Sequence, residues 1–450
     1  MKTDKYSIDK RREKLKEERN RLESTQLNGL RELLPDRVIK QICDECEYYF
    51  RIRLFTPLVT IFHMLGAAIS REGSFQSAWH NTGEVGRTDA LARARKRLPL
   101  KIWQGLDCWT TSEVEKEFGK EGLWQGHRVI GIDGSCFSME DEEELVSIFG
   151  RSGSKHGKSR FPIGRVVFAF MLNTMTVVSH KVGSYKTSEN SLFSKQMSQL
   201  LSGDLIIGDR GFAGAKRYRE YMQAGLEFIT RAHQQLKVEL LTKVEELGHN
   251  DFIVELPISA IYRRKDPTLP ESIRVRMVKT EARIREKETF WLVTSLLDAK
   301  KYPVQEIKML YKKRWKVEGL IEEIKIWLSA DVLRSKTEKG IYKEMYARVI
   351  AFNLTHWLIL KAAKKHQKSP EKISFSTTLR LVAAYSLKMS LSPFDRLPLL
   401  YEELLEKIAN AKIPYRPDRI EPRLKKRDQK HYSILKISRT EWRTINGVFA

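Results

Sequence analysis

Between residues 128 and 230 the chain alternates short apolar runs with stretches of helical character, and this alternation restricts the possible folds more than any other feature. The runs RVIGID, RVVFAFM and TMTVVSH predict three strands, and DLIIGD is typical of a buried parallel strand. In chain order we expect strands at 128–133, 165–171 and 174–180, a helix at 188–201, a strand at 204–209, a helix at 216–224 and a strand at 226–230.

Three strands, a helix, a strand, a helix and a strand follow one another as in an RNase H-like α/β core. Short alternating runs at 231–290 predict a β-rich insertion, and Pro303 is expected to start a long helix that reaches Leu328. We therefore expect an α/β protein in three regions: a basic, helical region at 1–120, the RNase H-like region at 121–330, and a helical region with a basic tail at 331–450.

The balance of charge limits the classes of partner. Among 450 residues, 81 are Lys or Arg and 57 are Asp or Glu, which leaves a formal net charge of +24. Such a charge is typical of a protein that binds a polyanion. Nucleic acid is favoured over an anionic membrane, because no single cationic amphipathic helix carries the charge.

The apolar segments and the cysteines exclude other classes. The longest apolar stretches, 58–69 and 349–360, fall short of the roughly 20 residues that span a bilayer. No apolar segment follows the basic N-terminus as in a secretory signal, so we expect the protein to stay in the cytoplasm. Four cysteines do not predict a disulfide framework, and the pair Cys43 and Cys46 lacks the further ligands of a zinc site.

Two aspartates end predicted strands of the core. Asp133 closes RVIGID and Asp209 closes DLIIGD, so both are expected at the carboxyl ends of strands, where open α/β sheets bind their ligands. Each alone is equally consistent with an ordinary turn after a strand.

The predicted helix at 303–328 carries a line of polar side chains. Tyr311, Arg314, Glu318 and Lys325 stand at offsets that place them within a sector roughly 60° wide at about 100° per residue. A solvated helix face with i,i+4 ion pairs is the alternative interpretation, but it does not explain the aligned tyrosine.

The spacing Tyr-x2-Arg-x3-Glu-x6-Lys of these four residues resembles the signature of the DDE transposases of the insertion-sequence-four family. Further segments resemble that family in matching order and extend the similarity over about residues 57–430. They are ARARKRLP, IGIDGS, IFGRSGSKHGKSRFPIGRVVF, IIGDRGF, VLRSKTEKGIYKEMYARVIAFNL and RIEPRLKKR. Glu322 and Glu323 are alternative candidates for the glutamate of this signature, but only Glu318 satisfies the spacing.

The resemblance implies that Asp133, Asp209 and Glu318 hold two divalent ions for phosphodiester cleavage. Hard oxygen ligands favour Mg²⁺, with Mn²⁺ as a substitute. It also implies that Tyr311, Arg314 and Lys325 grip DNA phosphates beside the cut. Trp291 resembles a tryptophan that stacks on a flipped base in some relatives, although packing on its own strand is an equally good interpretation.

A basic loop is expected to follow the phosphate backbone of the DNA. Its cations are Arg151, Lys155, Lys158 and Arg160. The function we expect is that of a transposase that binds the terminal inverted repeats of its element as a homodimer, cuts double-stranded DNA and joins the 3′ ends to a target, with a hairpin intermediate as one route. Another RNase H-like nuclease or integrase, or a silent DNA-binding descendant of a transposase, is the alternative.

Overall fold

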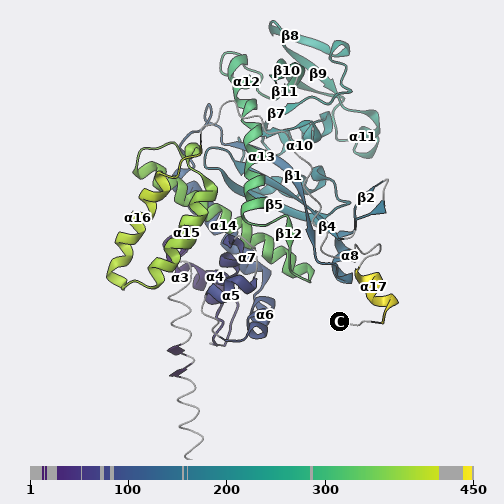
Figure 1. Cartoon of the computed structure of the whole chain (residues 1–450). Coiled ribbons are helices and arrows are strands. Elements are labelled where there is room, and N and C mark those ends of the chain that lie inside the picture. Colours follow the sequence, from purple (N-terminus) through teal and green to yellow (C-terminus); the bar gives the residue numbers. More distant parts are fainter. Residues whose placement is uncertain are drawn as a thin grey trace, which may run out of the picture. The chain divides into compact units, whose positions relative to one another are not determined.

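The structure is a computed structural model with a mixed α/β fold that contains a large central sheet and helices (Figure 1). It describes residues 13–14, 16–17, 28–51, 53–70, 75–81, 86–154, 157–159, 161–283, 287–414 and 439–447. The chain divides into two compact units, and each combines segments that are distant in the sequence. The first unit comprises Met1–Thr110, Phe137–Gly164 and Glu323–Ala450, and the second comprises Thr111–Cys136 and Arg165–Glu322. Residues 415–430, in the predicted basic tail, lie outside the described residues.

The central sheet has the strand order β5-β4-β1-β6-β7-β11-β10-β9-β8 along its described path. Its strands are β1 (Val129–Met139), β4 (Ile163–Met171), β5 (Thr176–Ser184), β6 (Leu205–Gly208), β7 (Glu227–Arg231), β8 (Thr242–Gly248), β9 (Asp251–Pro257), β10 (Ser272–Arg283) and β11 (Lys287–Thr294). Strands β1, β4, β5, β6 and β7 follow the predicted succession, with α9 (Glu189–Ser194) and α10 (Ala215–Gln223) as its two helices. A short helix and two short strands, which the expected order does not include, come between β1 and β4.

Strand β1 is longer than predicted. It continues past Asp133 to Met139, and its last residues pair in parallel with β12 (Val332–Leu333) in the first unit. The expectation that Asp133 ends its strand is therefore wrong. Gly134-Ser135 has the composition of a turn, but β1 continues through these residues, and it pairs at Ser138 and Met139 with a segment about 200 positions away.

The helix predicted at 188–201 is also shorter than expected. The Ser188 side chain caps its start, since the hydroxyl accepts a hydrogen bond of 3.1 Å from the N–H of Ser191. The helix ends at Ser194, and Gln196 then turns inward, where its side chain donates to the carbonyl of Val167 over 3.1 Å. A 3₁₀ turn at Met197–Gln199 completes the connection.

Four strands occupy most of the region at 231–290 for which a β-rich insertion is predicted, and they extend the central sheet. Strands β8 to β11 pair in antiparallel fashion and lie side by side in Figure 1, with β11 joined to β7. The short helix α11 (Ala260–Lys265) connects β9 to β10. Inside the insertion, the fully buried Arg276 donates to both oxygens of Asp251 over 2.7 and 2.6 Å.

The long helix predicted from Pro303 to Leu328 is interrupted twice. It consists of α12 (Val304–Lys312), α13 (Arg314–Glu322) and a π-helical segment at Glu323–Trp327. Lys313 marks the first break, and the N–H of Leu328 bonds to the carbonyl of Glu323 over 3.3 Å, the i→i−5 pattern of a π turn. The constant 100° per residue assumed from the sequence therefore does not hold as far as Lys325.

The first unit is mostly helical and is built around α14 (Glu338–Lys365). Most side chains of α14 are buried, and it packs against α4 (Pro57–Ile69), α15 (Phe375–Ser390) and α16 (Leu397–Ala409). The other elements are α2 (Asn28–Arg31), α3 (Asp36–Glu45), α5 (Phe75–Asn81), α6 (Thr88–Arg97), α8 (Glu143–Phe149), β2 (Gly153–Ser154), β3 (Gly157–Lys158) and α17 (Arg439–Ile445), and α7 (Leu100–Phe118) runs across the unit boundary. Among the described residues, no helix combines the length and the apolar character that crossing a membrane requires.

Candidate active site

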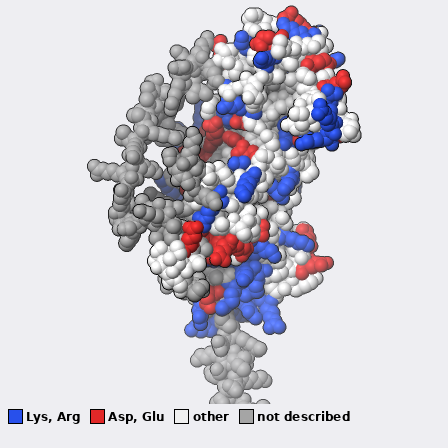
Figure 2. Space-filling view, turned by 90° about the vertical axis from the view of Figure 1, so that its right-hand side faces the viewer, with Lys and Arg blue, Asp and Glu red and all other residues white. Residues whose placement is uncertain are grey.

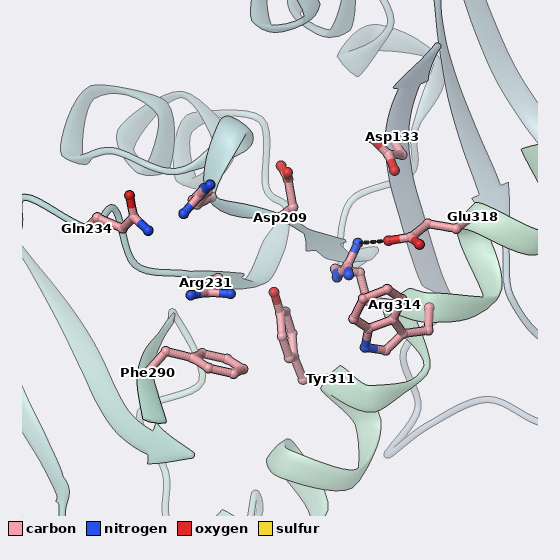
Figure 3. Close-up of a pocket in the computed structure, with 10 residues that line it drawn as sticks. Asp133, Asp209, Arg231, Gln234, Phe290, Tyr311, Arg314 and Glu318 are labelled. Atoms are coloured by element: carbon pink, nitrogen blue, oxygen red, sulfur yellow. Dashed lines mark hydrogen bonds and ion pairs between the residues drawn. The ribbon is translucent and has the colours of Figure 1, made fainter. Parts of the chain in front are cut away.

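A pocket of about 450 Å³ in the second unit brings together five of the predicted site residues (Figure 3). Its lining residues are Asp133, Asp209, Arg210, Arg231, Gln234, Phe290, Tyr311, Arg314, Trp315 and Glu318. All three predicted catalytic carboxylates are present, together with the tyrosine and the arginine of the predicted signature.

The register of two parallel strands makes Asp133 and Asp209 neighbours. Strands β1 and β6 pair up to Gly131 and Ile207, so each aspartate lies two residues beyond the last pair. Asp133 Oδ1 accepts a hydrogen bond of 2.7 Å from the N–H of Gly134. Asp209 Oδ1 accepts one of 2.8 Å from Gly211 at the start of a 3₁₀ turn. Both carboxylates are thus oriented by the backbone beside them.

Helix α13 reaches this edge of the sheet because Gly131 has no side chain. A Cβ atom on Gly131 would lie 2.4 Å from Cγ2 of Val317, far inside van der Waals contact. This close packing places Glu318 beside the strand that carries Asp133. Glu318 accepts a hydrogen bond of 2.9 Å from Arg314, which the dashed line in Figure 3 marks.

Aromatic and cationic side chains form the other side of the pocket. Tyr311 is buried, and its hydroxyl donates to the carbonyl of Gly208 over 3.4 Å. The Phe290 ring lies edge-on to Tyr311, with centroids 6.1 Å apart, and the guanidinium carbon of Arg231 is 4.4 Å from the Phe290 centroid. Arg314 stands over the Trp315 ring at 4.5 Å. These flat groups are suited to hold a strand of nucleic acid by cation and ring contacts.

Five lining residues were not predicted from the sequence: Arg210, Arg231, Gln234, Phe290 and Trp315. Arg231 could have been predicted from the sequence. It ends β7, the parallel neighbour of β6, and so belongs to the edge of the sheet that holds Asp209. Arg210 follows Asp209 directly. For Gln234, in a connection without periodicity, the sequence held no signal.

Burial and neighbouring like charges disfavour the ionised form of the carboxylates in the pocket. The pKa of Asp133 is raised to about 6, chiefly by burial; the charges of Asp209 and Glu189 contribute to the rise, whereas the Gly134 N–H and Arg314 oppose it. Burial also raises the pKa of Glu189, and it raises the pKa of Tyr311 to about 12. A cation bound between these carboxylates would relieve their repulsion.

The donor set fits a hard divalent cation, although the groups are not gathered around one point. Carboxylate oxygens are the ligands that Mg²⁺ and Mn²⁺ prefer. Within the part of the chain that the structure describes, no group of three or more His, Cys, Asp or Glu side chains is arranged to hold a metal ion. Glu318 is engaged by Arg314, so metal binding would require this carboxylate to turn toward the two aspartates.

Other predicted residues lie elsewhere. Trp291 follows Phe290 on β11; it is half-buried and packs against the core at Phe252, with centroids 5.2 Å apart. Lys325 lies on the π turn in the first unit and does not line the pocket. The roles assigned to both residues stay predictions.

The predicted basic loop is only partly within the described residues. Arg151 pairs with the buried Asp141 over 2.5 Å in the first unit. Lys158 lies on β3, without a described side-chain position, and Lys155 and Arg160 lie outside the described residues. The DNA contacts expected of this loop stay predictions.

Comparison with known proteins identifies the class to which this pocket belongs. Residues 124–354, just over half of the chain, match the family model of the transposase DDE domain. The chain therefore belongs to the DDE transposase family.

Individual relatives agree with the sequence-based resemblance. The chain is 26% identical to the transposase InsG for insertion sequence element IS4 of Escherichia coli (strain K12) over 344 residues, which cover 75% of this chain and 76% of that protein. It is 23% identical to a probable transposase for insertion sequence element IS5377 of Geobacillus stearothermophilus, over 38% of this chain and 44% of that protein. The predicted resemblance to the insertion-sequence-four family is confirmed.

A solved piggyBac transposase synaptic complex with hairpin DNA aligns with 86% of this chain and 85% of that chain. The TM-score is 0.41 and the sequence identity is 12%. This likeness is too weak to support an argument about fold or function.

Proposed function

We propose that this transposase binds the terminal inverted repeats of a mobile element, cleaves the DNA there by metal-dependent hydrolysis, and joins the 3′ ends to target DNA. The observation that carries the proposal is the meeting of Asp133, Asp209 and Glu318 in one pocket, beside Arg314 and Tyr311. A hairpin intermediate is one route for the cut, on the family resemblance alone.

The order of the sheet supports an RNase H-like assignment for the core. Strands β5, β4 and β1 are adjacent, and β6 and β7 continue the sheet in parallel from β1. This order puts the carboxyl ends of β6 and β7 next to Asp133, where an α/β sheet binds its ligand.

Asp133, Asp209 and Glu318 are proposed to hold two Mg²⁺ ions, with Mn²⁺ as a substitute. Bound metal of this kind supplies a nucleophile at neutral pH and stabilises the departing oxygen of an in-line displacement. The protein's own part is to hold the carboxylates in place, through the Gly134 and Gly211 N–H groups and the packing of α13 on Gly131.

The cations and rings of the pocket are proposed to orient the DNA strand. Arg314 and Tyr311 would contact phosphates beside the cut, and Lys325 is assigned the same role by the family signature. Arginine suits this task because its planar fork can hold two phosphate oxygens at once. Arg231 and Arg210, which also line the pocket, extend this set of cations.

We propose that regions outside the catalytic pocket recognise the ends of the element and bring two copies of the protein together. The basic residues of 1–120 would bind the element ends, and two copies of the chain would bring two ends together. On the face drawn in Figure 2, Lys and Arg side chains gather in patches, which supports a polyanionic partner. We place this activity at the nucleoid in the bacterial cytoplasm.

The test is strand cleavage of a duplex that carries the inverted repeats flanking the gene. We expect cleavage in Mg²⁺ or Mn²⁺ and none in EDTA. Asp133→Asn, Asp209→Asn and Glu318→Gln should abolish cleavage and leave binding of the duplex largely intact, because carboxylates hold metal whereas Lys and Arg hold phosphate. The matched control is Glu322→Gln, an exposed glutamate on the same helix, which should cleave normally.

The outcomes separate the alternatives. Cleavage without joined products, in reactions that contain target DNA, would favour another RNase H-like nuclease. Binding of the ends without any cleavage by the native protein would favour a silent descendant. An inactive Glu322→Gln together with an active Glu318→Gln would show that the third carboxylate is misassigned.

A further inference from the structure

A second cavity, of about 340 Å³, lies in the first unit between the loop that joins α3 to α4 and the end of α6. It is lined by Tyr48, Tyr49, Phe50, Arg51, Arg53, Phe55, Pro57, Thr60, Ala94, Arg97 and Leu98. Its size falls in the lower part of the range of small-ligand sites. Its lining combines aromatic rings and arginines and contains no carboxylate.

The aromatic rings of this cavity are presented to solvent. Tyr49 is 85% exposed and Phe50 is 41% exposed, whereas Leu98 and Thr60 beneath them are buried. Tyr48 and Phe50 stack on each other, with centroids 5.9 Å apart and ring planes 25° apart. Single exposed aromatic residues are common on proteins, but two in succession, next to the half-buried Tyr48 and beside arginines, indicate a surface for flat ligands.

Arginines supply a uniform positive charge at the cavity. Arg51, Arg53 and Arg97 are all exposed, and none forms an ion pair with a described residue. Arg97 acts on the Tyr48 hydroxyl: burial raises the pKa of Tyr48, and the Arg97 charge opposes that rise. The site can therefore accept an anion without first losing an internal partner.

The position of Arg97 is fixed by a buried contact within the same unit. The Lys343 ammonium donates hydrogen bonds of 3.0 Å each to the carbonyls of Arg95 and Lys96 in the last turn of α6. This contact satisfies carbonyls that a helix end leaves free, and it holds the turn from which Arg97 projects.

We propose that this cavity binds an unpaired nucleotide of a DNA strand, with its base stacked on the rings of Tyr49 and Phe50 and its phosphates held by Arg51, Arg53 and Arg97. The inference rests on the proposed function, in which the chain binds and opens DNA ends. Aromatic stacking together with backbone cations is the general way in which proteins bind single strands. Bases within a duplex are covered by their neighbours, so a site for duplex phosphates alone would not need exposed rings.

The test measures binding by fluorescence anisotropy with the full-length protein and three labelled probes. The first is oligothymidylate of about 12 nucleotides, within the range of single-strand site sizes. The second is an abasic strand of the same length, and the third is a blunt duplex. We expect the native protein to bind oligothymidylate more tightly than the abasic strand, because only the former offers bases for stacking.

Substitutions at the rings should separate stacking from charge. Tyr49→Ala should weaken oligothymidylate binding about 5- to 150-fold, the range for loss of one stacked base, and leave abasic and duplex binding within about twofold. Tyr49→Phe should retain full affinity. Arg51→Gln should weaken both single strands alike. The matched control is Tyr262→Ala on α11, an exposed tyrosine beside Lys216, which should have no effect.

Two results would overturn the inference. One is equal affinity of the native protein for oligothymidylate and the abasic strand. The other is an equal or absent effect of Tyr49→Ala on single-stranded and duplex probes, which would indicate a duplex-binding or unrelated surface. Neither result depends on cleavage of the element ends, so a failure of the proposed function would be seen separately in the cleavage assay.

Discussion

The guanidinium of Arg314 donates a hydrogen bond of 2.9 Å to the carboxylate of Glu318, one turn further along α13. Arg314 is also confined by the Trp315 ring, so its side chain is only 12% exposed. The cation thus lies inside the pocket, close to the carboxylate that we assign to the metal. Such a position is suited to stabilise charge that develops on the scissile phosphate.

We expect Arg314→Ala to act on the rate and not on binding. Loss of a positioned cation costs roughly 2 to 4 kcal/mol of transition-state stabilisation, so single-turnover cleavage of pre-bound end DNA should fall about 30- to 1000-fold. Affinity in a gel shift should change less than about threefold, and Arg314→Lys should rescue in part. Lys313→Ala, at the exposed neighbouring position, is the control. A loss of affinity as large as the loss of rate would assign Arg314 to a general binding surface.

Gly131→Ala should destabilise the second unit. The new methyl group would meet Val317 at 2.4 Å, and overpacking of this kind costs about 1–3 kcal/mol of the free energy of unfolding. Cleavage should fall as well, because α13 carries Glu318. The control is Gly319→Ala on the same helix, whose Cβ atom would meet nothing within 4 Å; it should stabilise by up to about 1 kcal/mol. Urea unfolding measures the free energy of unfolding of both variants. Equal values for Gly131→Ala and Gly319→Ala would contradict the close packing of α13 on Gly131.

Much of the site could be predicted because its residues follow local rules. Asp133 and Asp209 each close a short apolar run that predicts a strand, although only Asp209 comes directly after the end of its strand. The spacing of Tyr311, Arg314 and Glu318 follows helical periodicity. The register of β1 against β6 shows why the rule works: parallel strands bring their carboxyl ends to one edge.

The features that were not predicted depend on contacts between distant parts of the chain, which local sequence patterns do not reveal. The part of β1 beyond Asp133 ends in the pairing of Ser138 and Met139 with β12, and the π turn before Leu328 changes the angular position expected for Lys325. Alternation along β11 places one of two adjacent aromatic residues in the pocket and the other in the core. The sequence suggested Trp291 for the site, whereas Phe290 is the residue that lines it.

Arg276→Leu should be the most damaging change in the β-rich insertion. Arg276 is fully buried and donates to Asp251 and to the carbonyls of Leu296 and Tyr302, so its removal leaves a buried charge without its partner. We expect a loss of about 3–5 kcal/mol in the free energy of unfolding. Arg274→Leu, two positions earlier, removes an exposed pair with Glu255 and should change stability by less than about 1 kcal/mol. Similar losses in both variants, measured by urea unfolding, would contradict the role of burial.

The raised pKa of Asp133 predicts that stability depends on pH in the metal-free protein. Burial raises this pKa from 3.8 to about 6, so folding favours the protonated carboxyl. That contribution to stability is fully present below about pH 4 and is lost as the pH rises through about 6. In EDTA at pH 7.5, Asp133→Asn should therefore raise the free energy of unfolding by about 1–3 kcal/mol, and the gain should vanish near pH 4.

At pH 7.5, adding Mg²⁺ should make the native protein more stable than Asp133→Asn, which reverses the order of stability expected in EDTA. A cation that binds only the folded state stabilises it by mass action, and this gain requires the Asp133 carboxylate. Native protein should thus become more stable with rising Mg²⁺, whereas Asp133→Asn should respond weakly. Asp395→Asn, at an exposed position in the first unit, should follow the native protein at every pH and Mg²⁺ concentration. If Mg²⁺ stabilises Asp133→Asn as strongly as the native protein, Asp133 does not hold the metal.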